Sequence, residues 1–454
     1  MPEPLPLTLY RAAWVLPVCA EPIRNGAVLV GPDGRIAAVG PALAIETPEG
    51  CIVEDLGDAA ILPGLVNVHA HPELAMFRGA LEDLCFRDWI LRLVGAKRAA
   101  LTDADFHAAA RWTMVEALRS GITTLAATES SGASASALRE AGLRGVVYQE
   151  VFGPDPAVCG EAMAGLRANV DCLRAWECDR VRIGISPHAP YTVSDALFSA
   201  AAEYALAERL PMAVHAAESA IEHQLVQAGE GDFAPGLRAR GIDTPPRGRT
   251  TVEMLDRLGV LRTSPLLIHC VLLDADDIRR VGDTGSTVAH CPVANARLGH
   301  GLAPYPEMLR ENVRVGLGTD SVGSNNRLDL LEEARIASVL HRARLGDCGV
   351  LGPAELLKLC TIDGARALGM EHSVGTLEPE KDADLCVVSL AAPHVRPVHD
   401  PVAAVFHAAR GCDVVLTAVQ GRVLYRDGLL ATLDPAALEP AVEDAARRLR
   451  EALA

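Results

Sequence analysis

Lysine is nearly absent from this 454-residue sequence, which contains only Lys97, Lys358 and Lys381. Acidic residues number 59 against 42 basic ones, so the formal net charge is −17 and positive charge is scarce. Such an excess of acidic side chains repels phosphate backbones and anionic membrane surfaces. The composition therefore argues against a nucleic acid polymer or a membrane as a partner. With 50% hydrophobic and 22% charged residues, the chain is of ordinary globular type.

Two further patterns are missing. The 12 cysteines lie singly along the chain and no two of them have CxxC spacing, which argues against a disulfide framework and favours reduced thiols in the cytoplasm. No apolar run approaches the ~18 residues of a membrane span. Residues 12–20 faintly resemble a signal peptide, but Glu3 precedes them and a strand-and-turn pattern follows. We therefore expect a cytoplasmic protein.

Strand patterns occur at both ends of the chain. Residues 26–30 and 35–40 are apolar runs on either side of a Gly-Pro-Asp-Gly turn, which is typical of a hairpin. Similar runs return at 383–388 and 414–425, and the residues from Pro435 onward form one amphipathic helical pattern. A length of 454 residues corresponds to about three domains, or to one large barrel with a smaller unit.

Eight apolar runs separated by helix-sized segments occupy the middle of the chain. The runs are 62–69, 121–125, 145–148, 181–185, 212–215, 266–269, 286–290 and 313–318. Alternation of this kind over about 300 residues is typical of an α/β fold, the (β/α)8 barrel of TIM type.

Polar residues mark the ends of these runs. His69 and His71 close the first run and, being two apart on a strand, face the same side. His215 and His269 end the fifth and sixth runs, and Asp320 follows the eighth. Because the active site of such a barrel forms at the C-terminal ends of its strands, these side chains point to one site. Each of them alone is more often a structural residue, but together they favour a metal site.

Five segments carry a family resemblance. They are Leu62–His71, Ser186–Thr192, His215–Glu218, His269–Cys270 and Gly318–Ser321. Together they resemble the amidohydrolase superfamily, in its branch of cytosine-deaminase-like enzymes and adenosine-type nucleoside deaminases. The resemblance implies a metal-dependent barrel, here 61–372, and a small discontinuous β-sandwich domain built from both chain ends, here 1–60 and 373–430. The helix at 435–454 follows.

The resemblance also implies a metal centre. Its ligands would be His69, His71, His215 and Asp320. Some relatives bridge two metals with a carboxylated lysine on a middle barrel strand, but no lysine lies between Lys97 and Lys358. This absence argues for one divalent metal. Three histidines and one carboxylate favour Zn²⁺, with Fe²⁺ as the alternative.

Glu218 lies three residues beyond His215, at the mouth of the same strand. Hydrolytic deamination must remove a proton from the attacking water and supply one to the leaving amine. We hypothesise that Glu218 carries the first proton to a ring nitrogen of an amidine-like heterocycle and that Asp320 helps to protonate the ammonia. The resemblance places His269 beside the water. The plainer alternative is a surface glutamate after a strand.

The substrate class is predicted from the two groups of purine-nucleoside deaminases that the chain resembles most. Trp89 lies where S-adenosylhomocysteine/5-methylthioadenosine deaminases have a tryptophan beside the nucleoside. However, Arg98 occupies the place of the glutamate with which those enzymes hold the ribose hydroxyls. This departure weakens the resemblance to that group.

Aminodeoxyfutalosine deaminase, of the alternative menaquinone pathway, resembles the chain at 69–74, at 86–90 and in the longer insert 228–233. In this interpretation Glu73 holds sugar hydroxyls and Arg78 pairs with a substrate carboxylate, although a first-turn helix glutamate and a solvated arginine are the plainer alternatives. The family uses a histidine at the position of His188 to contact the sugar or the substrate head.

The sequence thus predicts a metal-dependent deaminase of an aminopurine nucleoside, most closely 6-amino-6-deoxyfutalosine. S-adenosylhomocysteine or 5-methylthioadenosine is the second choice, and a guanine or triazine hydrolase the third. A barrel without activity, kept as a scaffold, is the alternative outside enzymes, and the complete metal set argues against it. The partners of the predicted deaminase would be the nucleoside substrate and water. Family habit suggests a homo-oligomer.

Overall fold

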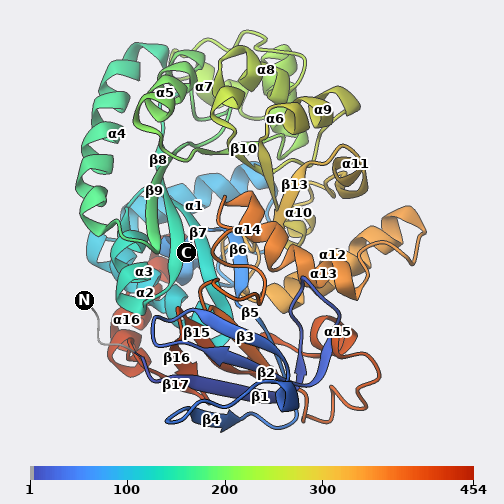
Figure 1. Ribbon diagram of the computed structural model, residues 1–454. Helices are drawn as coiled ribbons and strands as arrows, with labels where there is room; N and C mark the ends of the chain where they lie inside the picture. The colour runs from blue at the N-terminus through green and yellow to red at the C-terminus, as the bar shows by residue number, and fades with distance from the viewer. Residues whose placement is uncertain (1–4) are drawn as a thin grey trace.

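The computed structural model describes residues 5–454. Figure 1 shows a barrel of parallel strands surrounded by helices, and below it a strand-rich part in which N-terminal and C-terminal strands lie side by side. This is the predicted TIM-type barrel with a small β-sandwich domain built from both chain ends. The fold class predicted from the sequence is confirmed.

The barrel strands form two parallel four-stranded sheets, ordered β6-β7-β8-β9 and β10-β11-β12-β13. Single parallel bridges, Ile185 with Met212 and Ala70 with Asp320, join the two sheets on both sides. They close the ring and bring all eight C-terminal strand ends to one rim. The strands are β6 (Leu65–Ala70), β7 (Ile122–Glu129), β8 (Arg144–Val151), β9 (Val181–Pro187), β10 (Ala213–Ala216), β11 (Leu266–His269), β12 (Thr287–His290) and β13 (Arg314–Leu317).

The helices alternate with these strands. Many begin at a residue whose side chain accepts hydrogen bonds from the first turn, as Ser194, Ser219, Thr250 and Asp274 do. The helices are α1 (Phe86–Ala100), α2 (Asp103–Arg119), α3 (Ala133–Ala141), α4 (Cys159–Leu173), α5 (Asp195–Glu208), α6 (Ala220–Ala228), α7 (Ala234–Arg238), α8 (Thr251–Arg257), α9 (Ala275–Asp283), α10 (Pro292–Arg297), α11 (Tyr305–Arg310), α12 (Leu330–Leu345), α13 (Pro353–Leu359), α14 (Ile362–Ala367), α15 (Pro401–Ala403) and α16 (Pro435–Leu453).

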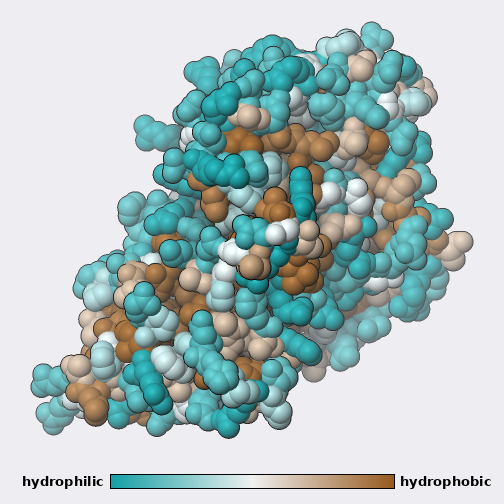
Figure 2. Space-filling model, turned by 90° about the vertical axis from the view of Figure 1, so that its right-hand side faces the viewer, coloured by the Kyte–Doolittle hydropathy of each residue, from teal (hydrophilic) through white to brown (hydrophobic). Residues whose placement is uncertain are grey.

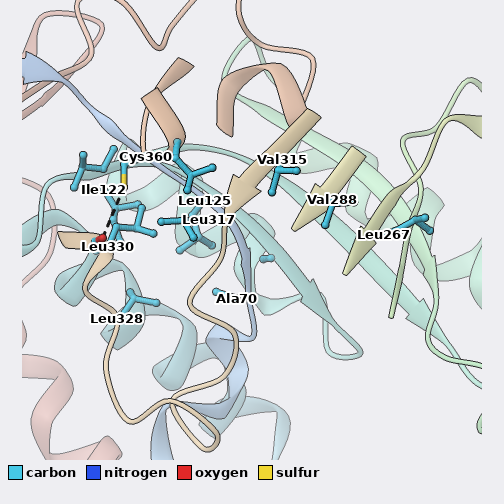
Figure 3. Packing of buried hydrophobic residues seen from close by; sticks show 14 of the residues in the cluster. Ala70, Ile122, Leu125, Leu267, Val288, Val315, Leu317, Leu328, Leu330 and Cys360 are labelled. Atoms are coloured by element: carbon cyan, nitrogen blue, oxygen red, sulfur yellow. Dashed lines mark hydrogen bonds between the residues drawn. The ribbon is translucent and has the colours of Figure 1, made fainter. Parts of the chain in front are cut away.

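Alternate residues of the barrel strands enter different apolar clusters, because side chains alternate across a strand. Leu267, Val288 and Val315 are direct partners on β11, β12 and β13 and lie in the cluster that packs against the helices (Figure 3). Their neighbours Ile268 and Ala289 belong to a separate cluster. Both faces of the parallel strands are therefore buried, as is usual for such a barrel.

The β-sandwich domain contains one continuous sheet of nine strands within residues 5–454, in the order β17-β16-β15-β14-β5-β1-β2-β3, with β4 paired to β1. β5 and β14 join its N-terminal and C-terminal parts. The buried guanidinium of Arg144 on β8 connects the domain to the barrel, at 2.6 Å from Asp382 and 3.1 Å from Asp384. The strands are β1 (Thr8–Val15), β2 (Ile23–Val30), β3 (Ile36–Pro41), β4 (Ile52–Asp55), β5 (Ala59–Pro63), β14 (Leu385–Ser389), β15 (Val414–Val419), β16 (Arg422–Arg426) and β17 (Leu429–Leu430).

The C-terminal helix α16 returns to the barrel and packs on α1 and α2. Its Ala445 and Leu449 are buried in the same cluster as Trp89 and Leu93 of α1. Arg448 donates to Asp105 at the start of α2, at 2.6 Å. The helix therefore supports α1, which forms one wall of the site described below.

The face in Figure 2 is largely hydrophilic, with apolar residues gathered in scattered patches. None of the helices between residues 5 and 454 is long and apolar enough to span a bilayer.

Two histidines form a buried pair beside the barrel. His290 at the end of β12 and His341 on α12 approach to 3.0 Å between their Nε2 atoms. One ring donates and the other accepts, so the accepting ring is neutral. Burial, with the neighbouring His341, lowers the pKa of His290 well below its usual 6.5. Burial, reinforced by Arg344, lowers the pKa of His341 to about 4.

This pair predicts a loss of stability in acid. Below the unfolded pKa of about 6.5 the unfolded chain binds more protons than the native one, so the free energy of unfolding falls as the pH drops toward the folded pKa. Each histidine contributes about 1.4 kcal/mol per pH unit in that range. Urea unfolding at pH 7.5, 6.5 and 5.5 should show a shallower acid dependence for His341→Gln than for the wild type. An equal pH dependence of the free energy of unfolding in both proteins would contradict a contribution of this histidine pair to the loss of stability in acid.

Candidate functional site

Four side chains converge at the C-terminal rim of the barrel. The rings of His69 and His71 from β6 and the segment after it have centroids 4.7 Å apart, and the ring of His215 from β10 lies 5.1 Å from that of His69. Asp320, just after β13, places Oδ1 3.2 Å from Nε2 of His69 and 3.4 Å from Nε2 of His71. The structure thus brings the four predicted metal ligands together.

The backbone at these strand ends is strained. Ala217, His269 and Asp320 have φ values of 52°, 75° and 59°, a left-handed conformation that residues other than glycine rarely adopt. Such conformations cost free energy and cluster at functional sites. Gly318 allows the ends of β6 and β13 to approach, since a Cβ there would lie 2.8 Å from Cβ of His69.

Hydrogen bonds orient the imidazoles. Nδ1 of His215 donates to the carbonyl oxygen of His188 at 3.1 Å, so the lone pair on Nε2 is free to bind a metal ion. Nδ1 of His69 lies 3.2 Å from the hydroxyl of Thr128. Burial, together with His69, lowers the pKa of His215 to about 3, and burial also lowers that of His69. Neutral imidazoles beside an ionised carboxylate are the donors that one divalent cation such as Zn²⁺ requires, so these residues fit the metal.

Glu218 lies next to this group. Its Oε1 is 3.5 Å from Nε2 of both His269 and His300, and its Oε2 accepts a hydrogen bond from the Tyr191 hydroxyl at 3.2 Å. Burial by itself raises the pKa of Glu218, but His269 and His300 outweigh it and lower the pKa to about 2. Asn295 accepts from Nδ1 of His269 at 2.9 Å and so aims Nε2 toward Glu218. A buried, ionised carboxylate at this place can receive a proton.

A second buried carboxylate fixes the backbone under Glu218. Glu222 on α6 accepts hydrogen bonds from the backbone N–H of Ala217 at 2.8 Å and of Glu218 at 3.1 Å. The Thr251 hydroxyl also donates to it at 2.6 Å. These bonds hold the turn that carries Glu218 to the rim.

A cavity of about 810 Å³ opens above the convergent residues, and its wall is mostly apolar. Trp89 on α1 is buried and donates its indole N–H to the carbonyl oxygen of Gly323 at 3.2 Å, so its ring faces the cavity as an apolar surface. The segment 232–240, around α7, covers another side. The apolar lining residues are Leu74, Phe86, Trp89, Ile90, Leu91, Leu93, Val94, Leu101, Phe106, Phe152, Tyr191, Phe233, Leu237 and Leu298.

The structure places three of the four expected substrate residues in this cavity. Trp89, His188 and Glu73 line it. Arg78 does not: it lies half-exposed, pairs with Glu116 on the outside of the barrel and is absent from the cavity wall. Its position points to the solvated role that the sequence also allowed.

Four lining or neighbouring residues have no role in the sequence-based interpretation: Lys97, Glu150, Tyr191 and His300. Lys97 on α1 pairs with Glu73 and donates to the Ser130 hydroxyl at 2.8 Å. Glu150 lies one residue from the end of β8, and polar residues ending that strand were a usable signal. His300 lies in a loop, where no spacing rule points to it.

Comparison with known proteins gives one family. The model of the amidohydrolase family matches residues 60–424. The chain is 34% identical to a 5-methylthioadenosine/S-adenosylhomocysteine deaminase of Syntrophobacter fumaroxidans, over 88% of this chain and 89% of that protein. It is 31% identical to a 5′-deoxyadenosine deaminase of Methanothermobacter thermautotrophicus, over 94% and 95% of the two chains.

Solved structures agree with the fold. An adenosine deaminase from Xanthomonas campestris with bound zinc matches with a TM-score of 0.87 and 28% identity, over 99% of this chain and 100% of that one. The aminofutalosine deaminase of Helicobacter pylori matches with a TM-score of 0.79 over 92% and 99% of the two chains. At 19% identity this second likeness shows the fold alone.

Proposed function

Because the chain belongs to the amidohydrolase family and is a hydrolase acting on carbon–nitrogen bonds, we propose that it removes ammonia from an aminopurine nucleoside. The observation that carries this proposal is the meeting of Glu218 and His269 with three histidines and Asp320 at the floor of one cavity. Relatives named as deaminases of adenosine-type nucleosides support it.

His69, His71, His215 and Asp320 would hold one divalent metal ion, for which Zn²⁺ is favoured by the donor set and by the zinc in the Xanthomonas structure. When bound, such an ion supplies the Lewis acidity that makes water a nucleophile near neutral pH. A single site accords with the position of Lys97, which pairs with Glu73 on the cavity wall and does not lie on a barrel strand.

Glu218 takes one proton from the attacking water and delivers it to the ring nitrogen beside the amino-bearing carbon. As the new carbon–oxygen bond forms, His269 orients the water through its Nε2. Asp320 passes the second proton of the water to the amine, and the carbon–nitrogen bond breaks to release ammonia. The product keeps the first proton on its ring nitrogen, so the two hydrogens of the water are accounted for.

The lining of the cavity supports the proposal that the substrate is a nucleoside with a large 5′ substituent. Its apolar wall suits an extended or aromatic group, and the exposed guanidinium groups of Arg98 and Arg240 also line it and can pair with a carboxylate. The insert that resembles aminodeoxyfutalosine deaminases forms part of this wall through Phe233. Aminodeoxyfutalosine, with a carboxylated aromatic ring on its 5′ side, is the substrate we propose for this enzyme.

The names of the relatives favour a second candidate. The sequence matches with high coverage carry the names of 5-methylthioadenosine/S-adenosylhomocysteine and 5′-deoxyadenosine deaminases. S-adenosylhomocysteine also ends in a carboxylate, whereas 5-methylthioadenosine has an uncharged methylthio group.

An ammonia-release assay over a panel of compounds tests both candidates. The panel contains aminodeoxyfutalosine, S-adenosylhomocysteine, 5-methylthioadenosine, adenosine, adenine and guanine. We expect kcat/KM for a 5′-substituted nucleoside to exceed that for adenine at least 100-fold, because the cavity contacts beyond the ring contribute binding free energy that the free base lacks.

The order of kcat/KM among the nucleosides decides the 5′ group. Arg98→Met should lower kcat/KM for the carboxylated nucleosides about 10-fold and leave kcat/KM for 5-methylthioadenosine unchanged. Turnover of free bases alone would contradict the nucleoside proposal. No turnover of any compound by the zinc-loaded protein would favour the scaffold alternative.

A further inference from the structure

Glu150 is a buried carboxyl on the cavity wall that the proposed mechanism does not use. It lies one residue before the C-terminal end of β8, and its side chain is 6% exposed. Its Oε1 is 3.9 Å from Nε2 of His188, which is too long for a hydrogen bond. Among the residues that the structure describes, Oε1 has no hydrogen-bond partner.

Two neighbouring carboxyls, by contrast, receive hydrogen bonds from the protein. Glu73 accepts from Lys97, from the Ser130 hydroxyl at 3.3 Å and from the Ser131 N–H at 2.9 Å. Glu129 accepts from the N–H and the hydroxyl of Ser134 at 2.6 and 2.5 Å. Both are therefore satisfied by the protein. A buried carboxyl oxygen without a donor is costly, so Glu150 has room for a donor from a ligand.

The surroundings determine which donor suits it. Burial, reinforced by Glu73, raises the pKa of Glu150 to about 8, as expected for a carboxyl that lacks donors. A cationic ligand group would meet Lys97, which lines the same cavity, and the cation of the proposed metal site. A neutral hydroxyl meets no such repulsion, because it can donate to Glu150 and accept from a cationic neighbour.

The position of Glu150 fits the part of the substrate next to the ring. One ligand atom each of Glu150, His188 and His215 lie within 4.8 Å of one another. A group bound to Glu150 is therefore adjacent to the place where the purine must lie for attack. In a nucleoside, the neutral hydroxyls nearest the ring are those of the sugar.

We infer that Glu150 binds the sugar hydroxyls of the substrate and so selects nucleosides over free bases and dideoxynucleosides. This inference rests on the proposed function. It assigns to β8 a contact that the sequence-based interpretation gave to Glu73, whose oxygens are largely occupied by Lys97, Ser130 and Ser131.

The test uses binding as well as turnover. Calorimetric titration of the zinc-loaded wild type, Glu150→Gln and Glu150→Ala with inosine and 2′,3′-dideoxyinosine measures the hydroxyl contribution without any chemistry. We expect the substitutions to raise the Kd for inosine 10- to 100-fold and to change the Kd for dideoxyinosine less than 2-fold. The same pattern should appear in kcat/KM for adenosine and 2′,3′-dideoxyadenosine. Glu129→Gln is the matched control, and it should affect the two members of each pair equally.

Several outcomes separate the inference from the proposed function. Equal effects of Glu150→Gln on both ligands, in an enzyme that deaminates nucleosides, would overturn the inference alone. Hydroxyl-dependent binding in a protein without turnover would support the inference and overturn the proposed function. If the wild type bound neither ligand and released ammonia from no nucleoside of the panel, both the inference and the proposed function would be overturned. A second equivalent of zinc in the wild type that is lost in Glu150→Gln would show a cation site instead. Melting temperature and zinc content identify a variant that fails to fold. If Glu150→Ala fails to fold, the test of the inference rests on Glu150→Gln, which keeps the side-chain size.

Discussion

Replacement of Glu218 by glutamine should lower kcat about 1,000-fold while the protein keeps its metal. The substitution keeps the size of the side chain and its hydrogen bond with Tyr191, but it removes the group that accepts and returns the proton. General acid–base catalysis is worth 10²- to 10⁴-fold, and 1,000-fold corresponds to about 4 kcal/mol in the activation free energy. Because glutamine still fills the cavity floor, KM should change little. Steady-state ammonia release and metal analysis of the same preparation measure these effects.

Glu116→Gln is the matched control for this variant. Glu116 pairs with Arg78 on the outer side of the barrel, away from the cavity, so its substitution should leave kcat within about 2-fold. A Glu218→Gln enzyme with full metal content and near-normal turnover would remove Glu218 from the proton route.

Replacement of His215 by alanine should abolish metal binding and reduce kcat more than 1,000-fold. His215 contributes one of the four donors, and its Nδ1 bond to the carbonyl of His188 keeps Nε2 directed at the others. With one ligand missing, the remaining donors hold the ion far less tightly. Metal analysis after dialysis should find less than a tenth of an equivalent, whereas the wild type should keep one.

A chelator gives the same information by another route. Because a ligand that binds only the native state stabilises it, removal of the metal should lower the melting temperature of the wild type by several degrees. It should leave the melting temperature of His215→Ala unchanged, and added zinc should restore activity to the wild type alone. His372→Ala, at an exposed histidine, serves as control. A wild type that loses neither activity nor stability with the chelator would contradict the metal assignment.

Much of the architecture is predictable from local patterns. Parallel barrel strands are buried on both faces, so they read as apolar runs, and the runs at 181–185 and 266–269 coincide with the starts of β9 and β11. The hairpin expected from the Gly-Pro-Asp-Gly turn is the pair β2 and β3. The strand ends are equally predictable, because histidines and an aspartate at the ends of several apolar runs together favour a shared site, although each of them alone is more often structural.

The cavity wall is less readable. Lys97 and Arg98 on α1 follow the same helical periodicity as many solvated helix residues. Both line the cavity, and only the packing of α16 on α1 and of α1 on the barrel decides this. Arg78 shows the opposite case, because a residue near the metal ligands in sequence points to the outer side and pairs with Glu116. A contact between distant segments depends on chain paths that no local spacing encodes.

The sequence by itself determined the barrel, the family resemblance, the metal ligands proposed for it and the position of Glu218, because each follows from local patterns: the alternation of apolar runs along the chain, short motifs, or a residue at the end of a run. Only the tertiary structure decided how those residues are oriented and completed. His300 and Tyr191 meet Glu218 from separate loops, and Glu150 is left with an oxygen that no described residue satisfies. Hydrogen-bond satisfaction in a buried site depends on the three-dimensional neighbours of each atom, and those neighbours come from all parts of the chain.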